Sequence, residues 1–152
     1  MADRAMSSAL QFSQWGSWRS GYRVYSYAFE VLDPQTLDEL LTDREESRAE
    51  NRLLCAACGH PITRTSWRIV VGGAHQHRFT NPYGRVFHIG CFAEAPGCTQ
   101  IGEPTEEATW YNGFRWRIAL CGNCQTHVGW GFQEGSETAF FGLILDRLIS
   151  PS

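Results

Sequence analysis

The fold-determining stretch of this chain runs from Phe114 to Cys124 and reads FRWRIALCGNC. Its apolar residues are Phe114, Trp116, Ile118 and Leu120. Apolar side chains at every second position are typical of a β-strand with one buried face. This strand is predicted to run directly into Cys121-Gly122-Asn123-Cys124, a Cys-x-x-Cys motif that offers two thiolate ligands.

A second Cys-x-x-Cys motif, Cys55-Ala56-Ala57-Cys58, stands upstream of the first. Two thiolates at this spacing can bind one metal ion, and two such motifs can complete a tetrahedral four-sulfur zinc site. We therefore predict one structural Zn²⁺ per chain, which would tie the start of a domain to its later part. The predicted ligands are Cys55, Cys58, Cys121 and Cys124. Two alternatives stay open, namely two disulfides or one redox pair beside unrelated thiols.

The composition indicates a globular protein and disfavours several functional classes. Hydrophobic residues make up 43% of the 152 residues, charged residues 19% and aromatic residues 13%,. The formal net charge of −3 argues against a nucleic-acid-binding protein,. The sequence has no apolar run of about 20 residues that could cross a membrane and no signal-peptide pattern over residues 1–30. We expect a cytoplasmic monomer with few disulfides.

An N-terminal extension over residues 1–54 precedes the first cysteine motif. Alternating apolar residues predict a strand over 25–31. Asp33-Pro34 predicts a helix start, because Asp caps helices and Pro favours the first helical position. The helix is predicted to reach about Leu54, and its charged second half is interpreted as a solvated arm or linker.

The rest of the chain is predicted to be a β domain over residues 55–148, followed by a tail over 149–152. Alternating or continuous apolar residues predict its strands. These strands are expected over 67–71, 114–120, 128–132 and 140–145, between turns rich in Gly, Pro and Asn.

Three tryptophans, Trp110, Trp116 and Trp130, lie near the second cysteine motif and are either core residues or the walls of a site. The pair Asn112-Gly113 favours a two-residue hairpin. That hairpin would place Trp110 and Trp116 on opposite faces. The two indoles can share a pocket only if residues 105–111 form an irregular loop.

This region resembles the thalidomide-binding CULT domain of the cereblon family. The matching segments, in the family's order and spacing, are Phe79–Gly84, Trp110–Ala119, Cys121–Cys124, His127–Phe132 and Phe140–Leu143. The resemblance covers about Cys55 to Leu148. It implies a single-domain, bacterial-type relative, because residues 1–54 do not resemble the protease-like domain that precedes this module in cereblon.

The resemblance implies a mostly β fold in which two antiparallel sheets meet at an angle, a β-tent pinned at one end by the four-cysteine zinc site. It also implies a binding module for cyclic imides, either small molecules (glutarimide, thalidomide-type and uracil-like rings) or a cyclic imide at a protein's C-terminus. The ring would lie in a cage of three tryptophans closed by Phe132. The implied contact residues are Asn81, Pro82, Phe87, Ala108, Thr109, Trp110, Trp116, Trp130 and Phe132.

In the family, main-chain groups bind the imide edge. The carbonyl at the position of Ala108 accepts the imide N–H, and the N–H at the position of Trp110 donates to a ring carbonyl. The family carries a histidine where this chain has Ala108, so we expect weaker binding of the same ring. Thr109 replaces a serine and keeps the hydroxyl.

Two other functions stay open. An aromatic cage also suits quaternary ammonium or methylated lysine, and Glu106, Glu107 and Glu134 could assist a cation. A type B methionine sulfoxide reductase has a similar zinc-pinned architecture but requires an activated cysteine. Cys91 is a poor candidate, because its neighbours are apolar and include no arginine. We therefore expect a binding protein and not an enzyme.

Overall fold

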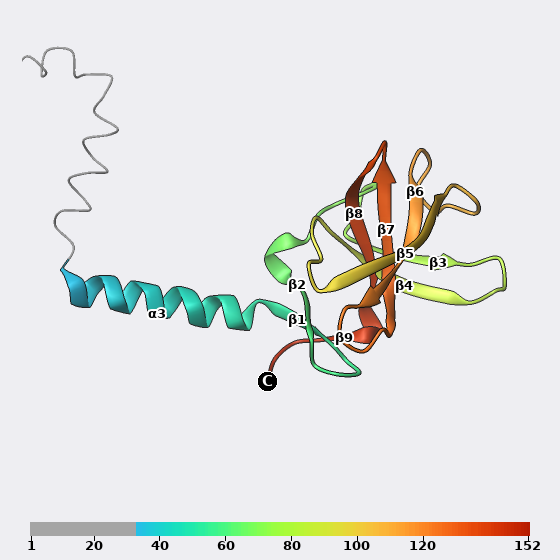
Figure 1. Cartoon of the computed structure of the whole chain (residues 1–152). Coiled ribbons are helices and arrows are strands. Elements are labelled where there is room, and N and C mark those ends of the chain that lie inside the picture. The colour runs from blue at the N-terminus through green and yellow to red at the C-terminus, as the bar shows by residue number, and fades with distance from the viewer. Residues whose placement is uncertain (1–32) are drawn as a thin grey trace, which may run out of the picture. The chain divides into compact units, whose positions relative to one another are not determined.

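The computed structural model describes residues 33–152 (Figure 1). The strand predicted over 25–31 lies outside the described residues. The chain divides into two units, Met1–Glu45 and Glu46–Ser152, and the β domain lies in the second.

Helix α3 spans Pro34–Glu50 and buries none of its residues. Asp33 caps it as predicted, since the backbone N–H of Thr36 donates to Asp33 Oδ1 at 2.9 Å,. The helix ends four residues before the predicted position of Leu54, because Arg52–Cys55 forms a strand instead. No helix of the described residues has both the length and the apolar character needed to cross a membrane.

Nine strands among the described residues form two antiparallel sheets (Figure 1). The three-stranded sheet has the order β2-β1-β9, and the six-stranded sheet has the order β3-β4-β8-β7-β6-β5. The smaller sheet contains β1 (Arg52–Cys55), β2 (Pro61–Arg64) and β9 (Leu148–Ile149). The larger sheet contains β3 (Gln76–Thr80), β4 (Val86–Phe92), β5 (Cys98–Thr105), β6 (Arg115–Cys121), β7 (His127–Glu134) and β8 (Glu137–Ile144). The predicted mostly β fold with two antiparallel sheets and one helix is confirmed.

Three of the four strand predictions in the domain are correct, and they correspond to β6, β7 and β8. The prediction over 67–71 is wrong, because Thr65–Trp67 is a short 3-10 helix. Beyond it, Arg68 and Val71 make only isolated bridges. The Gly72-Gly73 turn folds Val71 back onto Ala74, so the segment has no continuous partner strand. Ile69 and Val71 instead pack against the aromatic core.

The buried side chains form two clusters. One cluster lies between the sheets and around the cysteine motifs, and includes Ile62, Phe92 and Leu143. The other is mainly aromatic, and it contains Phe87, Ile89, Cys91, Tyr111, Trp130, Phe132, Phe140 and Ile144. The aromatic cluster supports the cleft described below.

The loop between β5 and β6 is irregular over 106–114. An irregular loop is the condition under which Trp110 and Trp116 can line the same pocket. Thr105 pairs with Trp116, so the tight hairpin register favoured by Asn112-Gly113 is not formed. These two residues instead make a local turn, in which Phe114 N–H donates to the carbonyl of Tyr111 at 3.0 Å. Gly113 supplies the positive φ of 88° that this turn needs,.

Candidate functional site

The four motif cysteines converge at one point of the β domain. Their Sγ atoms all lie within 4.8 Å of one another. The Cys55–Cys124 and Cys58–Cys121 pairs are separated by 3.7 and 3.6 Å. Four sulfurs placed ~2.3 Å from one tetrahedral ion would be ~3.8 Å apart. All six cysteines are free thiols, and a disulfide would require ~2.05 Å. The donor set therefore fits a metal ion, and the disulfide alternative is not formed.

Both motifs fold into the same backbone hairpin. In the first, Cys55 N–H donates to His60 O at 2.8 Å and Gly59 N–H donates to Cys55 O at 2.7 Å. In the second, Cys121 N–H donates to Thr126 O at 2.8 Å and Gln125 N–H donates to Cys121 O at 2.9 Å. Gly59 and Gln125 both adopt the left-handed conformation, with φ of 79° and 64°. The two halves of the four-cysteine cluster are thus built alike.

The surroundings of the four sulfurs differ. Burial raises the pKa of Cys55 to about 11, whereas a hydrogen bond from Asn123 lowers the pKa of Cys58. Thr126 Oγ1 lies 3.1 Å from Cys124 Sγ and, as a donor to the thiolate, lowers the pKa of Cys124 to about 6. The exposed Cys58 and Cys124 therefore ionise more readily than Cys55, and a bound cation would favour the thiolate at all four cysteines.

The remaining cysteines lack the features of a nucleophile. Cys91 is fully buried, its Sγ lies 3.3 Å from the hydroxyl of Tyr111, and burial raises its pKa. Burial also raises the pKa of Cys98 to about 12. A reductase nucleophile needs a lowered pKa and access to substrate, so neither thiol supports the enzymatic alternative.

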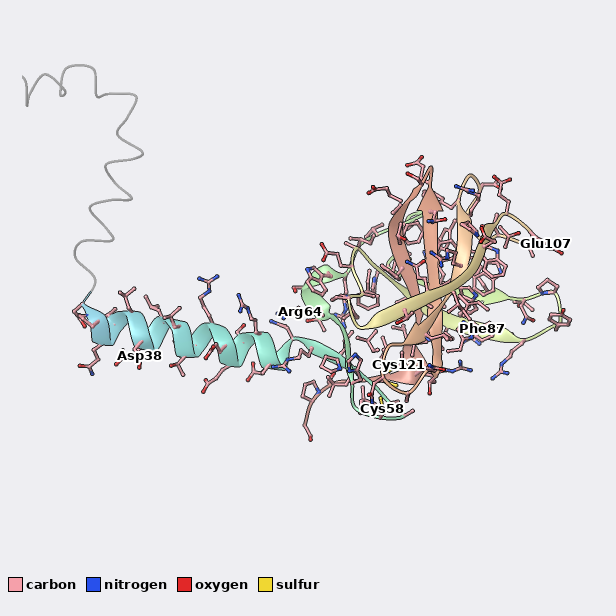
Figure 2. The ribbon with its side chains drawn as sticks, in the orientation of Figure 1. Asp38, Cys58, Arg64, Phe87, Glu107 and Cys121 are labelled. Atoms are coloured by element: carbon pink, nitrogen blue, oxygen red, sulfur yellow. The ribbon has the colours of Figure 1, made fainter. Side chains whose placement is uncertain are left out.

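A cleft of ≈ 490 Å³ opens on the aromatic side of the domain. Trp110, Trp116 and Trp130 all line it, together with Phe87 and Phe132. None of the four clustered cysteines lines the cleft, whose walls include Phe87 and Glu107, both labelled in Figure 2 together with Cys58 and Cys121 of the cluster. The cleft and the sulfur cluster are therefore separate sites.

Hydrogen bonds and ring packing hold the three indoles in place. Trp110 stacks on Phe79 with ring centroids 4.9 Å apart, and its Nε1–H donates to Thr80 O at 3.3 Å. Trp116 Nε1–H donates to the backbone carbonyl of Glu107 at 2.9 Å. Trp130 is 9% exposed and meets Trp110 edge-on at 4.8 Å. Because the indole N–H groups of Trp110 and Trp116 already donate to backbone carbonyls, their aromatic surfaces are the parts available to a ligand.

The β3–β4 turn forms another wall. The Asn81 carbonyl accepts a 2.9 Å bond from Gly84 N–H. Its side-chain Oδ1 accepts from the N–H groups of Tyr83 (3.0 Å) and Arg85 (2.8 Å). Asn81 therefore shapes the turn with both its backbone and its side chain, and it also lines the cleft with Pro82.

Thr109 is the one predicted contact residue that does not line the cleft. Its hydroxyl donates to Phe114 O at 2.9 Å and so stabilises the loop from within. The other eight predicted residues all line it, and so do five that were not among the predicted imide contacts. These five are Tyr83, Arg85, Glu107, Ile118 and His127. Glu107 was named only as a possible aid to a cationic ligand, and the even spacing of Ile118 with Trp116 could have indicated Ile118.

His127 lines the cleft from the start of β7. Its Nε2 lies 2.8 Å from Gly129 O, and its ring meets Trp130 edge-on at 4.7 Å. Burial has the largest effect on its pKa and lowers it. The hydrogen bond to Gly129 O raises the pKa by less, and the positive charges of Arg147 and Arg85 lower it further. The neutral ring therefore donates its Nε2–H to Gly129 O and packs against the side of Trp130.

Comparison with known proteins gives one consistent group of relatives. The chain is 32% identical over 75 residues to protein cereblon of Danio rerio, which covers 47% of this chain and 17% of that protein. It is 35% identical over 74 residues to cereblon of Xenopus tropicalis, covering 46% and 17%. It is 41% identical over 76 residues to cereblon of Drosophila simulans, covering 45% and 13%. The chain thus spans only a small part of the length of these relatives. No family model matches it.

Proposed function

Because the chain carries a cereblon-like domain of the CULT type, we propose that its aromatic cleft binds the ring of a cyclic imide. The ligand would be a free small molecule or a cyclic imide at the C-terminus of a protein. The observation that carries this proposal is the convergence of Trp110, Trp116 and Trp130 on one cleft. We further propose that the four-cysteine cluster holds zinc and that the protein acts by binding and not by catalysis.

The apolar part of a glutarimide suits the indole walls. Its methylene groups can lie against the faces of Trp116 and Trp130, which removes apolar surface from water at ~25 cal/mol per Å². Indole faces are large and rigid, so little side-chain entropy is lost when such a ring is enclosed. Phe132, only 1% exposed, supplies an apolar floor.

The polar edge of the ring needs hydrogen-bond partners, because each buried polar group left unpaired costs about 1–3 kcal/mol. Two main-chain groups of the loop are candidates, the carbonyl of Ala108 and the N–H of Trp110. Neither takes part in the backbone hydrogen bonds of the described loop. Ala108 lines the cleft and has a left-handed φ of 54°, in a turn closed by the bond from Thr109 N–H to Glu106 O at 3.1 Å. These features support main-chain recognition of an imide.

The charges around the cleft favour a neutral ring over the alternative quaternary ammonium ligand. Arg85 and His127 line the same cleft as Trp130, and neither stabilises a cation. Glu107 is the one carboxylate among the described lining residues. Cages for methylated lysine work by cation–π attraction, which a nearby guanidinium opposes.

Calorimetric titration of the zinc-loaded chain with glutarimide and with tetramethylammonium tests this proposal. We expect saturable glutarimide binding whose affinity changes little between about 50 mM and about 500 mM salt, since no charge is involved. Binding of tetramethylammonium alone, weakened by salt, would replace the imide proposal with the cation cage. Binding of neither compound would remove both.

A further inference from the structure

A guanidinium group stands at the wall of the cleft without a role in binding the neutral ring. Arg85 lines the cleft, and its Cζ lies over the ring of Phe87 at 5.5 Å from the centroid. This cation–π contact holds the side chain along the cleft wall. Its backbone is also fixed, because Arg85 N–H donates to Asn81 Oδ1 at 2.8 Å and Asn81 N–H donates to Arg85 O at 2.9 Å.

The positive charge of Arg85 acts on His127, which lines the same cleft. Burial is the main cause of the lowered pKa of His127, and the charges of Arg147 and Arg85 are further causes. No carboxylate is among the groups that act on His127. The guanidinium of Arg85, which lies over Phe87, therefore brings a positive charge to this part of the cleft.

The only carboxylate of the described lining residues is on a different wall. Glu107 belongs to the loop over 106–114, and its backbone carbonyl receives the indole N–H of Trp116. Arg85 comes instead from the β3–β4 turn, next to Phe87. Figure 2 labels Phe87 and Glu107, which mark these two walls. Among the described residues, the side chain of Arg85 makes no hydrogen bond to a carboxylate, so its charge remains available to a ligand.

A cyclic imide presents no charge to this guanidinium, but the substituent that leaves the ring can present one. We infer that Arg85 selects imides whose substituent carries a carboxylate, and that the preferred partner is a peptide with Asp or Glu directly before a C-terminal cyclic imide. This inference rests on the proposed function. A guanidinium suits this task, because its planar fork can donate two parallel hydrogen bonds to one carboxylate.

Two matched probes test the inference on the full chain. Both contain 3-aminoglutarimide, acylated in one probe with N-acetylglutamate and in the other with N-acetylglutamine, so that they differ by one charge. At low ionic strength we expect the glutamate probe to bind about threefold to fivefold tighter, the size of a solvent-exposed ion pair. In Arg85→Gln the two affinities should become equal.

Glu107→Gln is the matched control, because it removes the opposite charge from the other wall. It should keep or increase the preference for the glutamate probe. Equal affinity of the unmodified chain for both probes, or a preference that survives Arg85→Gln, would overturn the inference and leave the proposed function standing. If neither probe binds the unmodified chain, the proposed function fails, and the selectivity inference fails with it.

Discussion

The Sγ atoms of Cys55 and Cys124 lie 3.7 Å apart, although the two residues are 69 positions apart in the chain. Cys55 ends β1 in the three-stranded sheet, and Cys124 follows β6 of the six-stranded sheet. A metal ion bound to the four cysteines would therefore join the two sheets. Its binding free energy would contribute directly to folding, since the ligands are dispersed in the unfolded chain.

The purified protein should contain one zinc ion per chain, and a strong chelator should unfold the β domain. Elemental analysis measures the metal content, and circular dichroism with thermal melting measures the fold. Cys58→Ser removes an exposed ligand and should abolish stoichiometric zinc. Cys91→Ala should retain full zinc, because Cys91 lies in the aromatic cluster and not at the metal centre. A metal-free chain that melts at the same temperature would contradict a structural zinc site.

Gly97 should tolerate no side chain, because the backbone of Gly97 connects the second cysteine motif to the smaller sheet. Gly97 N–H donates to Ile62 O, and Gly122 N–H donates to Gly97 O. A Cβ at position 97 would lie 1.9 Å from the Pro61 carbonyl oxygen, so Gly97→Ala must displace backbone. We expect it to lower the free energy of unfolding by about 2–3 kcal/mol or more, measured by urea denaturation.

Gly90→Ala is the comparison for this variant. Its added Cβ would meet the side-chain ends of Leu145 and His75, at 2.8 and 3.1 Å, rather than backbone. Flexible side chains can move, so Gly90→Ala should cost less than Gly97→Ala. The reverse order would show that Gly97 has no special role in joining the sheets.

Ala108→His should tighten binding of glutarimide about threefold to tenfold. The substitution restores the side-chain donor that the CULT resemblance places there, and one added hydrogen bond contributes about 0.5–1.5 kcal/mol. The φ of 54° at this position is one that His tolerates better than β-branched residues do. Ala108→Phe, which adds a ring without a donor, should give no such gain. Equal gains for both variants would mean that ring packing, and not donation, is responsible.

The domain should lose stability as the pH falls below about 7. Burial lowers the pKa of His127 below its usual value near 6.5. In the unfolded chain the ring takes up a proton near pH 6.5, while in the folded chain it stays neutral to lower pH. Below about pH 7 the unfolded state then binds more protons than the folded state, so the free energy of unfolding decreases as the pH falls. Urea denaturation with excess zinc at about pH 7.5 and about pH 5.8 measures this loss.

The His127→Gln variant assigns this pH dependence. Gln can still donate to Gly129 O but does not titrate, so the variant should lose less stability over the same pH interval. An undiminished loss in His127→Gln would place the responsible group elsewhere.

Strands β6, β7 and β8 and the four-cysteine cluster could be predicted from the sequence because their signals are local. The alternation around Trp116 defines β6, and each Cys-x-x-Cys motif brings its own pair of ligands. Helix α3 begins at Pro34 as Asp33-Pro34 predicts. Its end could not be predicted, since the pairing of Arg52–Cys55 with β2 and β9 decides it.

The cleft was less predictable where it depends on contacts between distant segments. Arg85 and His127 line one cleft with Trp116, yet neither is a predicted contact residue, although they lie close in sequence to Pro82 and Trp130. They are brought there by the β3–β4 turn and by the start of β7. Thr109 is the opposite case, a predicted contact residue that does not line the cleft. Its hydroxyl donates to Phe114 O within the loop, and only the folded loop shows this hydrogen bond.

Titration of glutarimide into the zinc-loaded chain and into Trp116→Ala determines whether the indole-lined cleft binds a neutral cyclic imide. Trp67→Ala is the matched control, since Trp67 packs near Arg64 and does not line the cleft. We predict saturable binding to the unmodified chain and to Trp67→Ala, and none to a folded Trp116→Ala. Undiminished binding to Trp116→Ala, or no binding to the unmodified chain, would contradict the account.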